Sequence, residues 1–551
     1  MRNLQPWEQV VAKKRSLRDQ KIKPYIVADT DQRFPRVYNV HERTCLHDAS
    51  GFEEITDIDS VLQIFEQLKT GRITAEQTIL AYIKRAVVAH QLTNCFTEVT
   101  FEEALVQARD LDREFQRTGK VKGPLHGIPV TLKDQFNIKG VDSTLGYVGR
   151  SFAPAAQDAI LVRLLKDMGA VVLAKTNLPQ SIMWAETENP LWGLTTNPRD
   201  PALTPGGSTG GEAALLALRG SLLGFGTDIG GSIRIPQSLM GLYGLKPSSS
   251  RLPYHGVPVS TEGQEHIPSS IGPMGRDLSS LCYVSRALIE AKPWLLDPKC
   301  PPLPWNENAF REIQSRPMTI GLVVDDGVVR VHTPIARALR ELSTVLKAHG
   351  HDIVTWDASD HLECIRLMDL FYTVDGGEDV RRDVDAAGEP YIPHVEALVN
   401  RGKAVSVYEY WQLNKRKVAL QERYLNKWNA TLSPSGKHVD ILLAPTTPHP
   451  AIPHRSIRWV GHTKIWNFLD YPAVTFPVDR VRADRDELPA DYQPRNELDA
   501  WNWQLYDARA MDGHPVSLQV IGRKLEEEVV LGAASAIETL WKKACAIAEG
   551  A

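Results

Sequence analysis

Two segments between residues 205 and 247 combine hydroxyl side chains with closely spaced glycines. The first reads GGSTGGE and holds Ser208, and the second reads GTDIGGS and holds Asp228 and Ser232. Glycine at this density lets a backbone adopt positive φ angles and approach other groups closely. A serine there can act as a nucleophile if a base takes its proton and if N–H groups stabilise the developing oxyanion. Residues 205–247 are therefore the first candidate for a chemical site.

Three other templates fit these segments poorly. A phosphate-binding P-loop needs a lysine after its last glycine, and neither segment supplies one. A dinucleotide-binding loop needs G-x-G-x-x-G, whereas Gly224, Gly226 and Gly230 give G-x-G-x-x-x-G. The string GGSTG matches the G-x-S-x-G nucleophile elbow, but an elbow must follow a buried strand, and the run NPRDPALTP before it is polar and rich in proline. Simple tight turns would explain either segment alone, but two such loops 24 positions apart favour a site.

The order of these segments resembles the amidase signature family. The resemblance rests on GGSTGGE, on GFGTDIGGSIRIPQSLMGLYGLKPS and on the upstream GIPVTLKD. It extends from about residue 60 to 540 through KTNLPQS, TTNPRDP, NFLDYPAVTFPV and GHPVSLQVIGR. Within the family, the segments QLTNC, PLHG and EGQE are most similar to those of fungal acetamidases, or general amidases.

The resemblance implies a Ser-Ser-Lys triad. Its nucleophile would be Ser232, its proton-relay serine in a cis peptide would be Ser208, and its base would be Lys133. Backbone amides would form the oxyanion hole, at Ile229, Gly230, Gly231 and Ser232. Two further residues would line the acyl pocket, Ile182 and Met183. The family often has a second serine where this chain has Thr209, which still supplies a hydroxyl.

A lysine can act as the base only if its pKa lies near neutrality. The free side chain has a pKa of about 10.4, and burial in apolar surroundings lowers it. Ile128, Val130 and Leu132 flank Lys133 and could provide such surroundings. Histidine is the rival base, but no H-E-x-x-H pair is present, so the sequence carries no zinc-hydrolase signal.

Two further sets of side chains are assigned supporting roles. We expect Asp228 and Arg234 to form an ion pair that braces the second loop rather than to act on the substrate. Trp184 adjoins Ile182 and Met183 and is the best aromatic candidate for a pocket wall. Other aromatic residues are expected in the core, namely Trp192, Tyr243, Trp466 and Phe468.

The elements that must position these residues predict an α/β fold. Short β-branched runs indicate strands at 127–134, 171–174, 320–324, 440–445, 472–478 and 515–522. Helical spacing indicates helices near 7–17, 61–71, 74–90, 101–117, 157–168 and in the first part of 333–357. Segments 286–318 and 480–513 lack periodicity, which predicts long surface connections able to cover a site. The strand at 127–134 is expected to be the first.

The resemblance implies that this fold is one large, mixed, twisted β-sheet with helices on both faces and an N-terminal helical extension. We assign residues 1–75 to an N-terminal helical arm, with a short helix and an extended arm in the first 50 residues. Residues 76–545 are assigned to the catalytic domain.

The amino-acid composition limits the kinds of partner that the protein is expected to bind. The chain has 551 residues, 43% hydrophobic and 24% charged, with a formal net charge of −4, which is typical of a globular protein without the basic field of a nucleic-acid binder. No apolar run is long enough for a membrane span. Six dispersed cysteines favour reduced thiols and a cytoplasmic location. We expect no cofactor and no metal, and a homodimer is left open.

The resemblance predicts an amidase that converts a carboxylic amide into an acid plus ammonia or an amine, through an acyl ester on Ser232. Two alternatives stay open. The same triad could hydrolyse carbamates or esters. The chain could also be a partner-dependent subunit of the amidotransferase type, although its intact triad and N-terminal arm argue against this. In each case the expected ligand is a small molecule.

Overall fold

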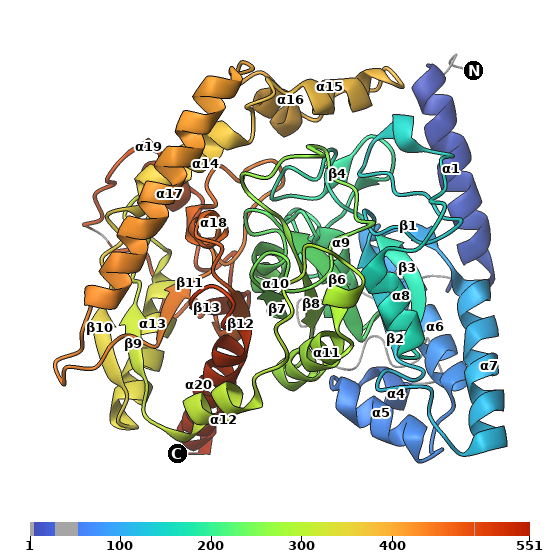
Figure 1. The fold of residues 1–551 in the computed structure, drawn as a ribbon, viewed down its shortest axis with the longest axis horizontal. Coiled ribbons are helices and arrows are strands. Elements are labelled where there is room, and N and C mark those ends of the chain that lie inside the picture. The colour runs from blue at the N-terminus through green and yellow to red at the C-terminus, as the bar shows by residue number, and fades with distance from the viewer. Residues whose placement is uncertain (1–4, 28–52, 490, 551) are drawn as a thin grey trace.

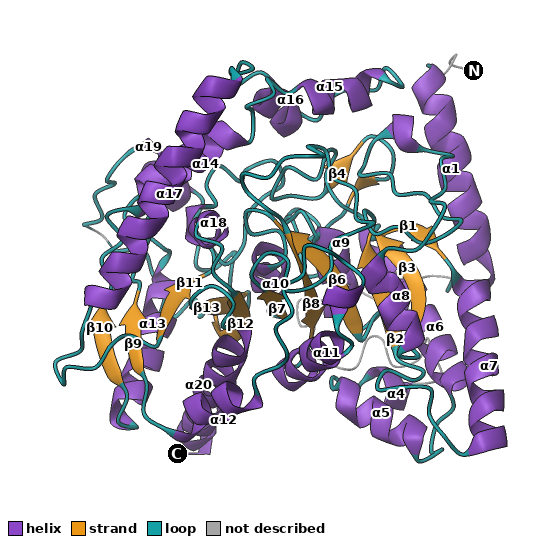
Figure 2. Ribbon diagram, viewed as in Figure 1, coloured by secondary structure: helices purple, strands orange, loops and turns teal. Residues whose placement is uncertain are grey.

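The computed structural model describes residues 5–27, 53–489 and 491–550. In this part of the chain eleven strands form one mixed sheet, which crosses the middle of the molecule (Figures 1 and 2). In spatial order they are β1 (Phe96–Val99), β3 (Val171–Thr176), β2 (Pro129–Lys133), β6 (Leu223–Asp228), β8 (Ser270–Gly275), β7 (Tyr243–Lys246), β12 (Ala473–Arg480), β13 (Pro515–Ile521), β11 (Ile441–Pro445), β9 (Thr319–Leu322) and β10 (Asp352–Thr355). A second sheet pairs β4 (Glu188–Asn189) with β5 (Gly193–Leu194).

Helices surround this sheet. They are α1 (Pro6–Ile22), α4 (Glu53–Thr56), α5 (Val61–Lys69), α6 (Ala75–Thr93), α7 (Phe101–Thr118), α8 (Ile160–Asp167), α9 (Gly210–Ala217), α10 (Arg234–Met240), α11 (Leu278–Glu290), α12 (Glu307–Ser315), α13 (Thr333–Ala348), α14 (His361–Phe371), α15 (Glu378–Asp385), α16 (Pro393–Val399), α17 (Val407–Ala430), α18 (Gly461–Phe468), α19 (Glu497–Gln504) and α20 (Glu527–Gly550), with 3-10 helices η1 (Lys23–Tyr25), η2 (Val148–Arg150) and η3 (Pro293–Leu295).

Strand β13 shows that helices cover both faces of the sheet. Successive side chains of a strand point to opposite faces. Leu518 and Val520 pack in one apolar cluster with residues of α13 and α20. Between them, Gln519 turns the other way and donates to the carbonyl oxygen of His462 in α18 at 2.8 Å. The predicted α/β fold, with one large mixed sheet between two helical layers, is therefore confirmed.

Strand β2 lies deep inside this arrangement. All five of its residues are buried, and it pairs in parallel with β3 on one side and β6 on the other. A parallel strand that is covered on both faces is typically a continuous apolar run, which explains why PVTL contains a single hydroxyl among apolar residues. Because β2 and β6 run in the same direction, their carboxyl ends meet at the same edge of the sheet.

The predicted helices in the first half of the chain are present. Thr74 caps α6, as its hydroxyl accepts from the backbone N–H of Gln77 at 3.1 Å and the Gln77 side chain accepts in return from the N–H of Thr74 at 3.0 Å. Helix α7 ends where Gly119 adopts a φ of 66°, and the helix predicted near residues 7–17 extends over Pro6–Ile22. The predicted extended arm falls largely outside the described residues.

Helices of the first 75 residues pack on the rest of the protein. Arg18 in α1 donates to the carbonyl oxygen of Phe96 in β1 at 3.1 Å. Val61, Ile64 and Phe65 of α5 belong to the same apolar cluster as residues of β2 and β3. The division of the chain at residue 75 stays a prediction.

Three expectations about secondary structure are wrong. The strand at 127–134 is not the first, because β1 precedes it and pairs antiparallel with β3. Segment 286–318 contains α12, which Asn306 caps by accepting from Ala309 N–H at 3.0 Å, and which packs against α20. Segment 480–513 contains α19, capped in the same way by Asn496. Both helices have eight or nine residues, and their proline-rich flanks hide the helical spacing.

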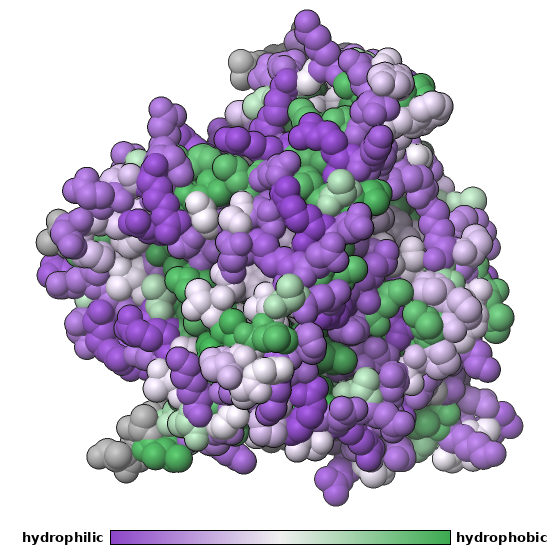
Figure 3. All heavy atoms as spheres, turned by 60° about the vertical axis from the view of Figure 1, so that its left-hand side comes forward, coloured by the Kyte–Doolittle hydropathy of each residue, from purple (hydrophilic) through white to green (hydrophobic). Residues whose placement is uncertain are grey.

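The surface is mostly polar. Figure 3 brings the α17 side forward and shows hydrophilic residues with hydrophobic ones gathered in several patches among them. No helix in the described part of the chain has the length and apolar character that a membrane crossing needs. Free thiols are present at Cys95, Cys282, Cys300 and Cys364, while Cys45 lies outside the described residues.

Candidate active site

Lys133 and the GTDIGGS segment meet at one edge of the sheet. The register pairs Leu132 of β2 with Phe225 of β6, so Lys133 at the end of β2 lies beside the last residues of β6. The GGSTGGE segment leads into α9, which packs against both strands. Both hydroxyl-bearing loops and the lysine are therefore neighbours in space, as predicted.

The amine of Lys133 is completely buried. Its Nζ lies 2.6 Å from Ser208 Oγ and 2.9 Å from Thr227 Oγ1. Burial lowers the pKa of Lys133 to about 7, although Asp228 and Asp134 partly oppose that shift through space. Near neutral pH a large fraction of this amine is therefore uncharged and able to accept a proton.

Thr227 fixes the direction of the hydrogen bonds around this amine. Its hydroxyl donates to Gln135 Oε1 at 2.7 Å, so its oxygen is left to accept from Lys133. When the amine is neutral, its lone pair can then face Ser208. The sequence reasoning assigned no role to Thr227 or Gln135, although Thr227 stands one residue before Asp228 in the motif.

The loop that carries Ser208 contacts the loop that carries Ser232. The Gly207–Ser208 peptide bond is cis. The next residue, Thr209, donates its backbone N–H to the carbonyl oxygen of Ser232 at 3.2 Å, which holds the two loops together. The Thr209 hydroxyl is buried and has no hydrogen-bond partner among the described residues.

Glu212, in the first turn of α9, is buried against strands β2 and β3. Its carboxyl accepts from the hydroxyls of Thr131 and Thr176. Burial raises the pKa of Glu212 to about 8, against the opposing effect of these two hydrogen bonds. The carboxyl is therefore mostly protonated near neutral pH and adds little charge to this part of the core.

The Asp228–Arg234 ion pair predicted from the sequence is present. Arg234 Nη2 lies 3.0 Å from Asp228 Oδ1, and both side chains are fully buried. Burial alone would raise the pKa of Asp228, but the Arg234 guanidinium outweighs it and holds that pKa at about 2. The carboxylate also accepts from the backbone N–H groups of Gly231 and Ile233. The Asp228 carboxylate therefore holds the backbone of the loop in place from the buried side. This is the bracing role that the sequence predicts.

The predicted oxyanion-hole amides divide into two groups. Gly231 N–H already donates to Asp228 at 2.8 Å. No backbone hydrogen bond starts from the N–H groups of Ile229, Gly230 or Ser232 within the described ranges of the chain. Of the four amides expected to form an oxyanion hole, these three therefore have no backbone acceptor among the described residues.

Gly231 is required by geometry. Its φ is +135°, a region that side-chain-bearing residues rarely adopt, and a Cβ there would overlap Thr463 Oγ1. The loop thus passes too close to α18 for any other residue.

Residues of the C-terminal half brace this loop from outside. Tyr372 donates its hydroxyl to the carbonyl oxygen of Ile229 at 3.0 Å, and Thr463 donates to that of Gly230 at 2.7 Å. Asn467 Nδ2 donates to Asp228 Oδ1 at 2.8 Å. Sequence reasoning missed Tyr372 and Thr463, which belong to no motif, and Asn467, which it quoted only as part of NFLDYPAVTFPV.

Two cavities meet at Ser232. The larger has a volume of about 260 Å³ and the smaller about 20 Å³. Ile182 and Met183, which the resemblance places in an acyl pocket, line both cavities. Burial increases from the cavities inward, since 9% of Ser232 is exposed, 1% of Ser208 and 0% of Lys133.

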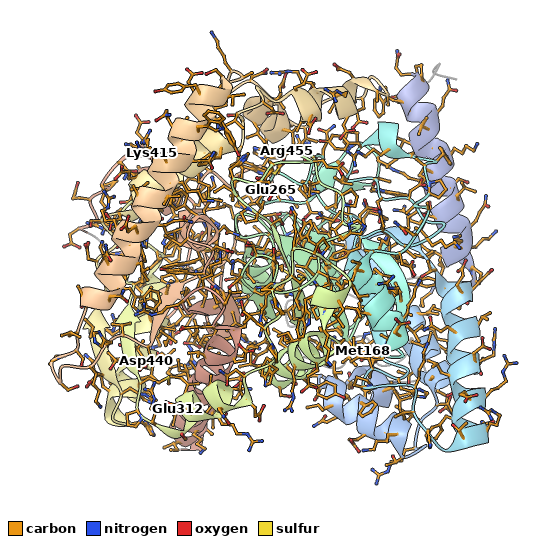
Figure 4. All side chains as sticks on the ribbon, viewed as in Figure 1. Met168, Glu265, Glu312, Lys415, Asp440 and Arg455 are labelled. Atoms are coloured by element: carbon orange, nitrogen blue, oxygen red, sulfur yellow. The ribbon has the colours of Figure 1, made fainter. Side chains whose placement is uncertain are left out.

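The aromatic residues divide as expected. Trp184 lines the larger cavity, whereas four others are buried: Trp192, Tyr243, Trp466 and Phe468. Of the two long connections, segment 480–513 reaches that cavity through Leu498, and no residue of 286–318 is among the described lining residues. Figure 4 labels Glu265 and Arg455, which belong to the loops beside the smaller and the larger cavity and lie above the middle of the sheet in that view.

Comparison with known proteins identifies the family. A family profile described as Amidase matches residues 77–531. Amidase 1 of Gibberella moniliformis is 54% identical over 536 residues, which cover 97% of this chain and 99% of that protein. Acetamidase of Aspergillus oryzae is 39% identical, over 87% of this chain and 89% of that protein.

Comparison of the fold with solved structures also points to amide hydrolases. The solved structure of a fatty acid amide hydrolase superposes with a TM-score of 0.89 at 31% identity, covering 97% of this chain and 95% of that one. The resemblance to amidases noted from the sequence is thereby confirmed. With a profile that spans most of the chain and relatives that match it almost end to end, the chain belongs to the amidase family and is an amide hydrolase.

Proposed function

We propose that this protein hydrolyses the C–N bond of a neutral carboxylic amide through Lys133, Ser208 and Ser232. The observation that carries the proposal is the fully buried Lys133 Nζ at 2.6 Å from Ser208 Oγ. A lysine with a pKa of about 7 is poised to accept and return a proton at neutral pH, which is what a general base must do.

The first half of the reaction forms an ester on Ser232. Its Oγ attacks the carbonyl carbon and gives its proton to Ser208 Oγ, whose own proton passes to neutral Lys133. The carbonyl oxygen becomes an oxyanion that the free N–H groups of Ile229, Gly230 and Ser232 can bind. When the C–N bond breaks, the proton returns from Lys133 through Ser208 to the leaving nitrogen.

The second half releases the acid. Water attacks the ester carbonyl carbon and gives a proton through Ser208 to Lys133. The bond between that carbon and Ser232 Oγ then breaks, and the same proton returns to Ser232. Each group is thereby restored, and the overall change is one amide plus one water to one acid plus ammonia or an amine.

Alanine substitutions test the three roles. Ser232→Ala is expected to abolish acyl-ester formation, and Lys133→Ala to be comparably damaging. Ser208→Ala is expected to be somewhat less so, because a water can partly replace a hydroxyl relay. Ammonia release from a simple amide and labelling of the purified chain by a fluorophosphonate are the two measurements. Turnover by Ser232→Ala at the wild-type rate would exclude Ser232 as the nucleophile.

The same assays separate the rival functions. If the protein alone hydrolyses simple amides and reacts with the fluorophosphonate, it needs no partner subunit. A panel of acetamide, benzamide, long-chain amides, carbamates and esters then ranks the substrates. A carbamate or ester turned over far faster than any amide would shift the assignment while keeping the three residues.

A further inference from the structure

Helix α17, which lies at the outside of the molecule in Figure 1, carries apolar residues on two opposite faces. Tyr424 and Trp428 on its inner face are buried in one apolar cluster with residues of α14. Its outer face presents Tyr408, Trp411 and Val418, of which 68%, 63% and 61% are exposed. A surface helix normally turns charged and polar residues toward solvent, so an apolar outer face indicates a docking surface.

The outer face of α17 has the spacing of a coiled-coil seam. Exposed residues follow one another at alternating intervals of three and four, and we call this set the outer stripe: Tyr408, Trp411, Lys415, Val418, Glu422 and Leu425. Such intervals keep a stripe on one side of a helix over several turns, where a second helix can lie against it. A capping box between Ser406 and Glu409 holds the first turn of α17, so the stripe is preformed.

The outer stripe is complementary to itself when two copies of α17 lie antiparallel. If Val418 lies on the two-fold axis, Lys415 of each copy faces Glu422 of the other, and two ion pairs form. In the same register Trp411 packs on Leu425 at both ends of the stripe. Within the described ranges of its own chain neither Lys415, which Figure 4 labels, nor Glu422 forms an ion pair, so both charges are left for this contact.

The charges of the outer stripe disfavour two other arrangements. In a parallel pair of helices each residue faces its own copy, so Lys415 would meet Lys415 and Glu422 would meet Glu422. Like charges that face each other across an interface are destabilising. An anionic lipid surface would repel the carboxylate of Glu422, which lies between Val418 and Leu425 in the middle of the stripe.

We propose that α17 is a homodimer interface, in which two copies of this chain pair antiparallel along the outer stripe with Val418 at the two-fold axis. This inference does not depend on the proposed function. Helix α17 is about 36 Å long and offers a strip about 10 Å wide. A strip of this size buries less surface than a permanent dimer, so we expect the two copies to separate at micromolar concentrations.

Sedimentation velocity of the full chain, from about 1 to about 200 µM, measures the association. We expect wild-type protein to shift from monomer toward dimer over this range. Val418→Glu brings two carboxylates together at the axis and should raise the dissociation constant at least about 10-fold. Leu295→Glu is the matched control, because Leu295 is 73% exposed on η3, which packs on α11, and its replacement should leave the association unchanged.

Charge reversals test the register of the two helices. Lys415→Glu and Glu422→Lys should each raise the dissociation constant at least about 10-fold, because every antiparallel pair then joins like charges. The double variant should associate as the wild type does. An equimolar mixture of the two single variants should also associate, as a heterodimer, since opposite charges face each other again. Lys347→Glu, at an exposed position of α13, is the control and should behave as the wild type.

Three results would overturn the proposal. The first is wild-type protein that stays monomeric at the highest concentration, and its cosedimentation with vesicles of phosphatidylcholine and phosphatidylglycerol would assign the stripe to a lipid surface instead. The second is a dimer that none of the stripe variants weakens, because its interface would lie elsewhere. The third is a mixture of Lys415→Glu and Glu422→Lys that does not associate. The substituted side chains are exposed, so circular dichroism should show the wild-type fold in every variant.

Discussion

Arg234 and Asp228 form an ion pair from which water is fully excluded, directly beneath the loop that carries Ser232. The carboxylate also accepts from backbone N–H groups within that loop, at Gly231 and Ile233. One side chain therefore neutralises a buried cation and sets the conformation of the candidate oxyanion hole.

Replacing Asp228 by Asn should destabilise the protein strongly. Breaking a buried ion pair typically costs about 3–5 kcal/mol, because the remaining charge stays in a medium that solvates it poorly. Urea unfolding monitored by circular dichroism measures the change. Glu290→Gln is the control, since it breaks the exposed Arg286–Glu290 pair and should change the free energy of unfolding by about 0.5 kcal/mol or less. A loss below 1 kcal/mol for Asp228→Asn would contradict the bracing role.

Replacing Lys133 by Met should remove activity and yet stabilise the protein at neutral pH. The folded pKa of about 7 lies below the unfolded value of about 10.4, so between these values the unfolded chain binds more protons and stability rises with pH. Well below pH 7 the wild type therefore carries a penalty of roughly 5 kcal/mol that Met lacks. Two lost hydrogen bonds, of about 1 kcal/mol each, offset part of the gain.

Unfolding measured at pH 6, 7, 8 and 9 tests whether the stability of the wild type rises with pH as predicted. The stability difference between Lys133→Met and the wild type should shrink by up to about 1.4 kcal/mol per pH unit above pH 7. Lys347→Met, at an exposed position of α13, serves as the control and should show no such trend. A difference that does not depend on pH would mean that Lys133 is not held largely uncharged.

Replacing Thr227 by Val should separate orientation from basicity. The valine keeps the shape but removes the oxygen that accepts from Lys133 at 2.9 Å. Loss of one such hydrogen bond disfavours the charged amine, so the acid limb of kcat/KM, expected near pH 7 in the wild type, should move to lower pH. The plateau rate should nevertheless fall by about 10-fold, as a bond of about 1.4 kcal/mol no longer orients the amine.

The matched control for this variant is Thr475→Val. Thr475 is equally buried, lies on β12 and hydrogen-bonds to Thr446 and to the carbonyl oxygen of Leu518. It should lose similar stability with no displacement of the acid limb. If both variants shift the limb alike, the effect of Thr227→Val comes from general loosening and Thr227 does not position the amine.

Replacing Gly231 by Ala should disturb the loop more than its backbone angle alone explains. The methyl group would overlap Thr463 Oγ1, so activity and thermal stability should both fall. Gly140→Ala provides the comparison, because Gly140 has a φ of +81° but open space around it, and its cost should be about 1–2 kcal/mol. The double variant Gly231→Ala with Thr463→Ala should recover part of the stability. Equal losses for the two glycine variants would exclude the steric explanation.

Much of the local structure follows from residues that are neighbours in sequence. Thr74 and Gln77 define the start of α6, and the apolar residues around Lys133 predict the buried strand β2. The Asp228–Arg234 pair is also local, because only five residues, 229–233 at the turn between β6 and α10, lie between its members. Weak local signals explain the errors, since β1 has only four residues and α12 has nine between irregular segments.

The sequence alone determined which chemical groups are available: two hydroxyls in glycine-rich loops and one lysine in an apolar strand. The tertiary structure decided which other side chains these groups contact. Lys133 contacts Ser208 and Thr227 across 75 and 94 residues of chain, and this depends on the register of β2 against β6. The role of Tyr372 and the unequal volumes of the two cavities depend likewise on packing between distant elements. Distances and volumes of this kind come from how whole elements dock, so no short stretch of sequence encodes them.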